Sequence, residues 1–172
     1  LHKGSLYRLL MKWDGGEGER LPAYSTYVVQ DQVTKIFSAV IWSEVSDYKW
    51  KNPYPKNRVT RPLIYETHVG MSSEAPMVNT YNDFRVNVLP RIVKAGYNTL
   101  QIMAIQEHPY YGSFGYHVSN FFAPSSRFGT PEELKQLIDE AHSYGLYVIL
   151  DLIHSHAVKN EVEGLSCYDG TD

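Results

Sequence analysis

The sequence predicts an α/β protein that contains the first three β/α units of a (β/α)8 barrel, preceded by part of an antiparallel β-sandwich. Three observations lead to this prediction. Short apolar runs separated by turn residues fill roughly the first 60 positions, which is typical of antiparallel strands. Strand-like and helix-like patterns then alternate, which predicts parallel strands joined by crossover helices. Each predicted parallel strand ends in polar side chains, as barrel strands do where they build a site.

Composition bounds the functions that are compatible with the sequence. The 172 residues include 16 basic and 19 acidic side chains, and the net charge of −3 gives no electrostatic footprint for nucleic acid. Because no apolar run approaches about 20 residues, we expect no membrane span. The single cysteine, Cys167, excludes an internal disulfide framework and suits a reducing compartment. The chain lacks an initiator Met and stops without a closing element, so we expect a fragment of a longer protein.

Residues 1–50 are predicted to be the C-terminal part of the sandwich module. Its strands are expected at Ser5–Met11, Tyr24–Gln30 and Lys35–Trp42, with breaks at Gly15–Gly18 and Asp31–Gln32. Three tryptophans of this region have two interpretations, a platform on which sugars stack or ordinary core packing. They are Trp13, Trp42 and Trp50.

Residues 51–62 are predicted to be a linker, because they contain prolines and cations but no apolar period. The barrel part is assigned to residues 63–172. Its first strand is expected at Pro62–Val69 and its first helix at Thr80–Gly96. Pro90 lies inside that helix and removes a backbone donor, which predicts a kink or break near Val86.

The second barrel strand is expected at Asn98–Gln106, followed by a long aromatic connection that we interpret as functional. The next helix has the clearest signals in the chain. Thr130 and Glu133 form a capping box around Pro131, apolar residues recur at helical spacing, and Gly145 supplies the stop. The third strand follows at once and carries Asp151 at its end.

The polar strand ends decide between two α/β folds. The first strand ends in Glu66 and His68, and no GxGxxG turn follows it, which argues against a dinucleotide-binding sheet. Gln106, Glu107 and His108 end the second strand, and Asp151, His154 and His156 end the third. From residue type alone, two interpretations stay open. Asp151 and His156 face a shared pocket, or Asp151 caps the strand and both histidines are solvated.

Several motifs resemble a known family. Asp151-Leu-Ile-His-Ser-His156 looks like the first signature region of the α-amylase superfamily. Four further stretches are similar to eukaryotic-type 1,4-α-glucan (glycogen or starch) branching enzymes: 62–71, 101–108, 113–130 and 164–172. The resemblance runs from about residue 61 to residue 172. Residues 1–60 fit the end of a carbohydrate-binding β-sandwich and its linker.

The resemblance implies a transglycosylase that cleaves an α-1,4 bond and rejoins the chain through an α-1,6 bond, in glycogen or starch biosynthesis. Such a retaining mechanism needs a carboxylate nucleophile and a carboxylic acid about 5–5.5 Å apart. In the family both lie beyond the point that corresponds to Asp172, so we assign no catalytic residue here and expect this chain alone to be inactive.

The resemblance also implies three substrate-binding residues. Tyr116 matches the tyrosine that stacks under the sugar ring at the cleaved bond. Asp151 matches the aspartate that orients the hydrogen-bond network of the site. His156 matches the histidine that donates a hydrogen bond to a hydroxyl of that sugar. Ser155 stands where many α-amylases have a calcium-binding Asn, so no metal and no cofactor is expected.

The expected partner is an α-1,4-glucan such as glycogen, amylose or amylopectin, bound by a protein that is monomeric at full length. The expected compartment is the cytoplasm, or a plastid if the source makes starch. Two rival functions stay open. A metal-dependent barrel hydrolase would use His154, His156 and Asp151 as ligands. A non-catalytic glucan-binding module would act through the three tryptophans.

Overall fold

The computed structural model describes residues 2–42, 48–56 and 59–171. The described residues group into two compact units, each formed by segments far apart in the sequence. The first unit comprises residues 2–42, 106–126 and 153–171, and the second comprises residues 48–56, 59–105 and 127–152. The predicted domain limits at residues 50 and 62 stay a prediction.

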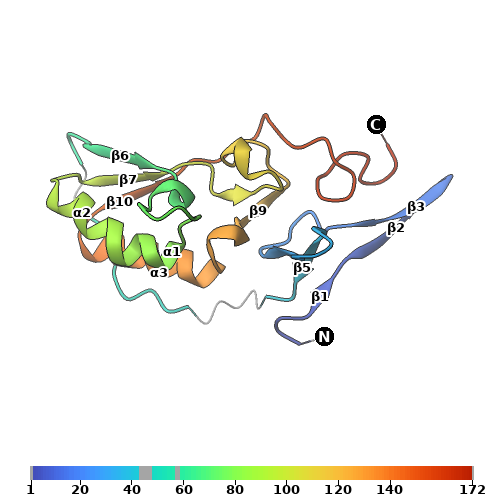
Figure 1. The fold of residues 1–172 in the computed structure, drawn as a ribbon, viewed down its shortest axis with the longest axis horizontal. Helices are drawn as coiled ribbons and strands as arrows, with labels where there is room; N and C mark the ends of the chain where they lie inside the picture. Colours follow the sequence, from blue (N-terminus) through green and yellow to red (C-terminus); the bar gives the residue numbers. More distant parts are fainter. Residues whose placement is uncertain (1, 43–47, 57–58, 172) are drawn as a thin grey trace. The chain divides into compact units, whose positions relative to one another are not determined.

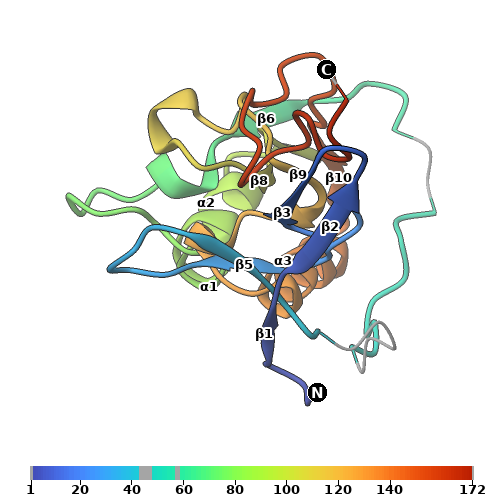
Figure 2. The same cartoon turned by 90° about the vertical axis from the view of Figure 1, so that its right-hand side faces the viewer.

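The N-terminal part of the first unit is antiparallel. Strands β1 (Leu6–Tyr7), β5 (Phe37–Val40) and β4 (Val28–Gln30) form one sheet in the order β1-β5-β4. Strands β2 (Leu9–Trp13) and β3 (Gly16–Arg20) form a separate hairpin, dark blue in Figure 2. A small core of this unit joins the sheet to residue 123 of the later segment: Leu21, Val28, Phe37, Ala39 and Ala123.

The hairpin corrects one prediction. Residues 15–18 were expected to break the strands, yet Gly16 and Gly18 are in β3, where they pair with Trp13 and Met11. The turn is confined to Asp14 and Gly15, and Gly15 has a φ of +92°. An Asp-Gly pair between two strands is a strong hairpin signal, and here the glycine is the residue that takes the positive φ, which it does without steric cost. Asp14 lies directly before the predicted break and Gly15 begins it, so the sequence contains the signal for the observed turn.

The second unit contains the predicted parallel sheet, with β7 (Thr99–Ile102) between β6 (Ile64–Thr67) and β10 (Tyr147–Leu150) (Figure 1). The three strands are in register, and they stand in the sheet in the order of the sequence. Sequential parallel order with a helical crossover between strands is how a (β/α)8 barrel begins.

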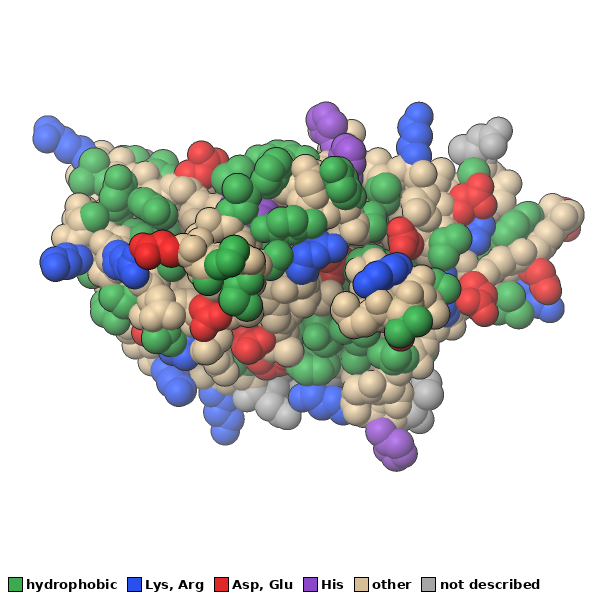
Figure 3. Space-filling view, viewed as in Figure 1, with side chains coloured by type: hydrophobic (Ala, Val, Ile, Leu, Met, Phe, Trp, Pro, Cys, Tyr) green, Lys and Arg blue, Asp and Glu red, His purple; other side chains and the backbone are tan. Residues whose placement is uncertain are grey.

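Helices cover one face of this sheet (Figure 1). Leu100 and Ile102, two residues apart on β7, are completely buried. The edges are less protected. Leu63 and Ile64, directly before and at the start of β6, are exposed, and so are Ile149 and Leu150 of β10. Figure 3 shows hydrophobic side chains at the surface over β6. Among the described residues, β6 and β10 pair only with β7.

The first crossover confirms the effect expected of Pro90. A short helix, α1 (Tyr81–Asp83), continues into a π-helical stretch at Phe84–Val88 and then into α2 (Leu89–Lys94). The N–H of Leu89 bonds to the carbonyl of Phe84, five residues earlier. Proline has no N–H and its ring crowds the preceding turn, so the helix widens directly ahead of it.

Helix α3 (Pro131–Ser143) has the predicted ends. The Thr130 side chain accepts a bond from the N–H of Glu133, whose carboxylate in turn accepts from the N–H of Thr130 at 2.7 Å. Gly145 follows the helix with a φ of +77°. The buried stripe includes Leu134, Leu137 and Ala141. Among the described residues, no helix combines the length and apolar character needed to cross a membrane.

The second strand was predicted too long. β7 ends at Ile102, and Ala104 then takes a left-handed φ of 38°. Residues Gln106–Glu107 form a separate strand, β8, which pairs antiparallel with β9 (Asn120–Pro124) in the first unit. Glu107 and His108, which were expected at an open strand end, are 1% and 0% exposed. They belong to a folded hairpin, which residue type and period did not reveal.

Candidate functional site

Asp151 lies where the sequence predicts it, at the carboxyl end of the third parallel strand. Its N–H donates to the carbonyl of Ile102 at 2.9 Å, and the N–H of Met103 donates to the carbonyl of Thr67 at 2.9 Å. These two bonds extend the sheet by one position past Leu150. Asp151 is therefore held by backbone pairing at the end of the sheet where parallel α/β proteins bind their ligands.

The face to which Asp151 belongs follows from the strand period. Side chains alternate between faces, so Asp151 shares a face with Ile149 and, across the sheet, with Gln101 and Glu66. This is the face opposite Leu100 and Ile102, which pack under the helices. Gln101 donates from Nε2 to Oε1 of Glu66 at 3.1 Å. The second unit thus presents polar groups on the face that would be the interior of a barrel.

His156 lies in the first unit, in an exposed segment after the strand. The hydroxyl of Ser155 is 2.6 Å from Nδ1 of His156. When that hydroxyl donates to Nδ1, the imidazole proton stays on Nε2, which is then free to donate outward. His154, which the sequence analysis left out of the sugar site, instead stacks on Phe121 at 6.5 Å with a 12° interplanar angle.

Tyr116 also lies in the first unit and is half-buried. Its N–H donates to the carbonyl of Ser113 at 3.0 Å, which closes a turn through Phe114 and Gly115, both with positive φ. The segment of Tyr116 meets that of His156 through a parallel bridge between Val118 and Ala157, with the N–H of Val158 2.9 Å from the carbonyl of Val118. The structure therefore brings these two segments together, whereas Asp151 belongs to the second unit.

Two buried polar side chains of β8 hold this arrangement, and the sequence analysis did not assign them that role. The Gln106 side chain accepts from the N–H of Ile153 at 2.7 Å and donates to the carbonyl of Phe121 at 3.1 Å. The Glu107 carboxylate accepts from the hydroxyl of Ser125 and from the N–H of Ser126, at 3.2 and 2.7 Å. Gln106 thus ties the segment that leads to His156, and Glu107 closes the loop that carries Tyr116.

We expect Glu107→Gln to loosen this loop. The substitution removes a charged acceptor from a fully buried site, and hydrogen bonds to charged groups contribute about 1.5–3 kcal/mol. Limited proteolysis followed by mass spectrometry checks this, with faster cleavage expected inside residues 108–126. Glu74→Gln, at a highly exposed carboxylate, is the control and leaves the cleavage rate of this loop unchanged. An unchanged cleavage rate in Glu107→Gln contradicts the role of Glu107 in closing this loop.

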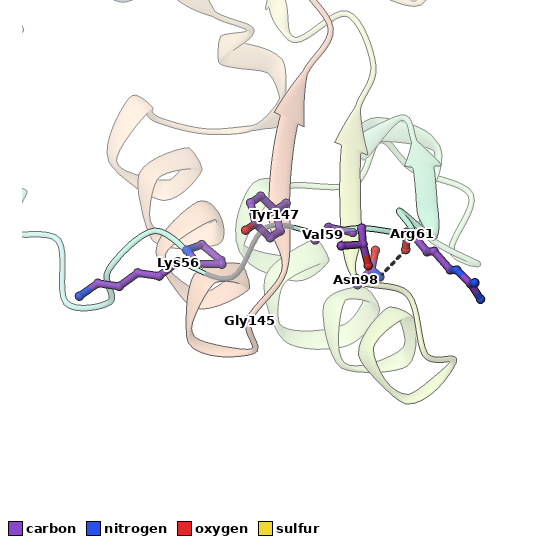
Figure 4. Close-up of a pocket in the computed structure, with 8 residues that line it drawn as sticks. Lys56, Val59, Arg61, Asn98, Gly145 and Tyr147 are labelled. Atoms are coloured by element: carbon purple, nitrogen blue, oxygen red, sulfur yellow. Dashed lines mark hydrogen bonds between the residues drawn. The ribbon is translucent and has the colours of Figure 1, made fainter.

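A cavity of about 550 Å³ lies at the opposite end of the parallel sheet (Figure 4). Asn98, directly before β7, and Tyr147, the first residue of β10, line it together with residues 55, 56 and 59–61. The Asn98 side chain donates to the carbonyl of Arg61 at 3.0 Å, while Figure 4 shows the side chains of Lys56 and Arg61 pointing away from the cavity. Its place at the amino ends of the strands separates it from Asp151.

The residues of the two rival interpretations fall in both units. In the part of the chain that the structure describes, no three His, Cys, Asp or Glu side chains are grouped so that they could hold a metal ion. Trp13 and Trp42 lie in the first unit and Trp50 in the second. Trp13 packs on the guanidinium of Arg20, and Trp42 meets Tyr27 edge to face at 4.8 Å.

Comparisons with known proteins match a large part of the chain. The family model "Alpha amylase, catalytic domain" matches residues 89–163. A chloroplastic/amyloplastic 1,4-alpha-glucan-branching enzyme 2-2 from Arabidopsis thaliana is 55% identical over 98% of this chain and 21% of its own length. The 1,4-alpha-glucan-branching enzymes of Yarrowia lipolytica and Saccharomyces cerevisiae are 54% and 48% identical, over 98% and 99% of this chain.

Solved structures agree on the fold. An alpha amylase from Salmonella typhimurium, described as putative, superposes with a TM-score of 0.74 at 23% identity over 95% of this chain and 27% of its own. The catalytic module of the glycogen-degrading pneumococcal protein SpuA superposes with a TM-score of 0.76 at 18% identity over 93% of this chain and 29% of its own. The chain spans about a fifth to a quarter of the length of the curated relatives named above.

Proposed function

The chain belongs to the family of 1,4-alpha-glucan-branching enzymes, and on that premise we propose that it acts within a longer enzyme that cleaves an α-1,4-glucan chain and rejoins it through an α-1,6 bond. The observation that carries this proposal is the identity of 48–55% to three such enzymes along 98–99% of the chain. We call the longer protein that contains this sequence the full-length enzyme. In its proposed fold, further β/α units complete the three parallel strands to a (β/α)8 barrel, which follows a β-sandwich in the sequence.

Within that enzyme we propose that Tyr116, Asp151 and His156 bind the sugar at the cleaved bond. Tyr116 would stack its ring on the apolar face of the pyranose. Asp151, held at the carboxyl end of β10, would orient neighbouring polar groups without attacking the sugar itself. His156 would donate from Nε2 to a sugar hydroxyl, with a bond that strengthens as charge develops.

The proposed chemistry is a double displacement. A carboxylate attacks the anomeric carbon while a carboxylic acid protonates the departing oxygen, and the glucosyl–enzyme ester is then opened by the 6-hydroxyl of an acceptor glucan. We assign both carboxyl groups to parts of the full-length enzyme outside this chain. We do not assign the role of nucleophile or acid to Glu66, Glu107 or Asp151. Glu107 in particular already accepts bonds that stabilise a loop.

The decisive experiment compares the full-length enzyme with the 172-residue chain. The full-length enzyme is expected to lower the iodine absorbance of amylose and to create α-1,6 linkages detectable by debranching or NMR. The isolated chain is expected to do neither. Turnover by the isolated chain contradicts the assignment of the acids, and a full-length enzyme that forms no α-1,6 bond contradicts the function.

The remaining properties follow as parts of the same proposal. The substrate is glycogen, amylose or amylopectin, and the full-length enzyme works as a monomer without a cofactor. It acts in the cytoplasm, or in a plastid where the source stores starch.

A further inference from the structure

Five rings of the second unit contact one another in series, and we call them the aromatic strip. Trp50 meets Tyr48 at 5.1 Å and the imidazole of His142 at 6.2 Å. Tyr54 meets His142 at 5.4 Å and Tyr147 at 5.2 Å, in both cases edge to face. Two of these side chains are largely solvent-exposed, Trp50 at 52% and Tyr54 at 58%. The strip therefore differs from a core cluster, in which large rings are hidden from water.

A buried carboxylate holds the exposed end of the strip in place. Asp139 of α3, only 2% exposed, accepts from the hydroxyl of Tyr48 at 2.6 Å and from the N–H groups of Lys51 and Asn52 at 2.9 and 2.8 Å. The Asn52 amide adds a bond at 3.0 Å. Burying a charge is costly unless it is hydrogen-bonded in this way. The segment has no helix or strand, yet it is anchored on both sides of position 50, by the Tyr48 side chain before it and by backbone N–H groups after it.

A fixed, exposed tryptophan on an otherwise irregular segment is a feature of ligand-binding surfaces. Rings that are immobilised before binding lose little conformational entropy when the ligand arrives. Folding brings only part of the gain that full burial would give, since about half of the Trp50 surface stays in water. A ligand that covers the strip would supply the burial that folding leaves incomplete.

The chemistry of the strip selects a sugar chain. A pyranose has an apolar face that packs on a flat aromatic ring and a rim of hydroxyl groups. The strip offers flat rings and the Tyr54 phenol. Where Tyr147 lines the 550 Å³ cavity, the Thr60 hydroxyl is a further polar group, beside Pro55 and Val59. The strip is thus suited to a carbohydrate polymer of the class that the proposed function uses.

We propose that the aromatic strip is an auxiliary binding site for an α-1,4-glucan chain, separate from the site at which the bond is cleaved. This inference rests on the proposed function for the identity of its ligand. Tyr147 begins the strand that Asp151 follows, so the two places are about 13 Å apart along β10. A glucan held on the strip keeps the polymer on the enzyme while another part of a chain enters the cleavage site.

Affinity electrophoresis of the full-length enzyme in gels containing amylopectin tests the proposal. We expect Trp50→Ala and Tyr54→Ala each to raise the apparent Kd for amylopectin about tenfold, as loss of a central aromatic anchor does. Trp50→Phe keeps a ring at the position and is expected to retain most of the affinity. Tyr144→Ala is the matched control, because Tyr144 is an exposed tyrosine next to α3 outside the strip.

The outcomes separate this proposal from the proposed function. Wild-type affinity in both Trp50→Ala and Tyr54→Ala overturns the strip, whatever the branching activity. Binding that collapses when salt is raised also overturns it, because exposed lysines of this segment would then be responsible. If the wild-type enzyme forms no α-1,6 bonds but binds amylopectin through Trp50 and Tyr54, the proposed branching function is contradicted. The proposal of a glucan-binding aromatic strip is then still supported.

Discussion

Replacing His156 with alanine in the full-length enzyme is expected to lower kcat about a hundredfold and to raise KM much less. The size follows from removing one donor that acts on developing charge. The structure supports that role, because the Ser155 hydroxyl lies 2.6 Å from Nδ1 and can hold the proton on Nε2. Initial rates of branching over a range of amylose concentrations separate the two constants.

The neighbouring histidine is the matched control for this experiment. His154 is also exposed but stacks on Phe121, so His154→Ala is expected to keep kcat within about twofold of wild type. His156→Ala with unchanged kcat and a raised KM would mean uniform binding of ground state and transition state, against the proposed role. Ser155→Ala should produce a smaller loss of kcat, because it frees the imidazole to change tautomer.

Replacing Asp139 with alanine is expected to destabilise the protein by about 3 kcal/mol. The substitution removes the acceptor that the Tyr48 hydroxyl and the N–H groups of Lys51 and Asn52 share, and hydrogen bonds to a charged group contribute about 1.5–3 kcal/mol each. These donors are only partly buried, so water replaces some of the lost bonds. Urea unfolding of the full-length enzyme, followed by tryptophan fluorescence, measures the change. Asp83→Asn, at an exposed carboxylate, should stay within about 0.5 kcal/mol of wild type.

The same carboxylate predicts a pH dependence. Burial acts to raise the pKa of Asp139, but the hydrogen bonds from Tyr48, Lys51 and Asn52 outweigh it and lower the pKa from 3.8 to about 2. A carboxyl group with a depressed pKa in the folded state stabilises the protein above its unfolded pKa. That contribution is complete above about pH 4 and disappears as the pH falls through about 2.

We therefore expect wild type and Asp139→Asn to differ most in stability at neutral pH and to converge towards pH 2. A difference that is constant from pH 7 to pH 2 would mean that the charge of Asp139 does not contribute. Burial also raises the pKa of the Tyr48 phenol, and the bond to Asp139 adds to that effect. Tyr48 therefore stays protonated as a donor across this range.

Local signals in the sequence predicted the elements whose structure depends on nearby residues. The ends of α3 follow from Thr130, Glu133 and Gly145, all of which act within a few positions of the helix. The distortion near Val86 follows from Pro90 in the same way. The hairpin turn at Asp14 and Gly15 is local too, although the prediction placed a longer break at residues 15–18.

Pairing between distant segments could not be predicted from such local signals. Gln106–His108 looked like the continuation of a strand, because an apolar run led directly into three polar residues. Their burial depends on Asn120–Pro124, Ser125 and Ile153, which approach only when the chain has folded. The hydrogen-bond partners of a polar side chain depend on the tertiary structure. From the sequence, Glu107 therefore had the features of a site residue, although its carboxylate is bonded inside the protein.

For this protein, residue type and spacing were enough to predict the parallel β/α pattern, the capped helix, the place of Asp151 after an apolar strand and the resemblance to a family. All of these depend on local quantities. The contact of the Tyr116 and His156 segments at Val118 and Ala157, and the anchoring of an exposed tryptophan by Asp139, are seen only in the folded chain. The physical reason is that a buried polar group is stable only with its hydrogen-bond partners, and folding alone brings those partners together.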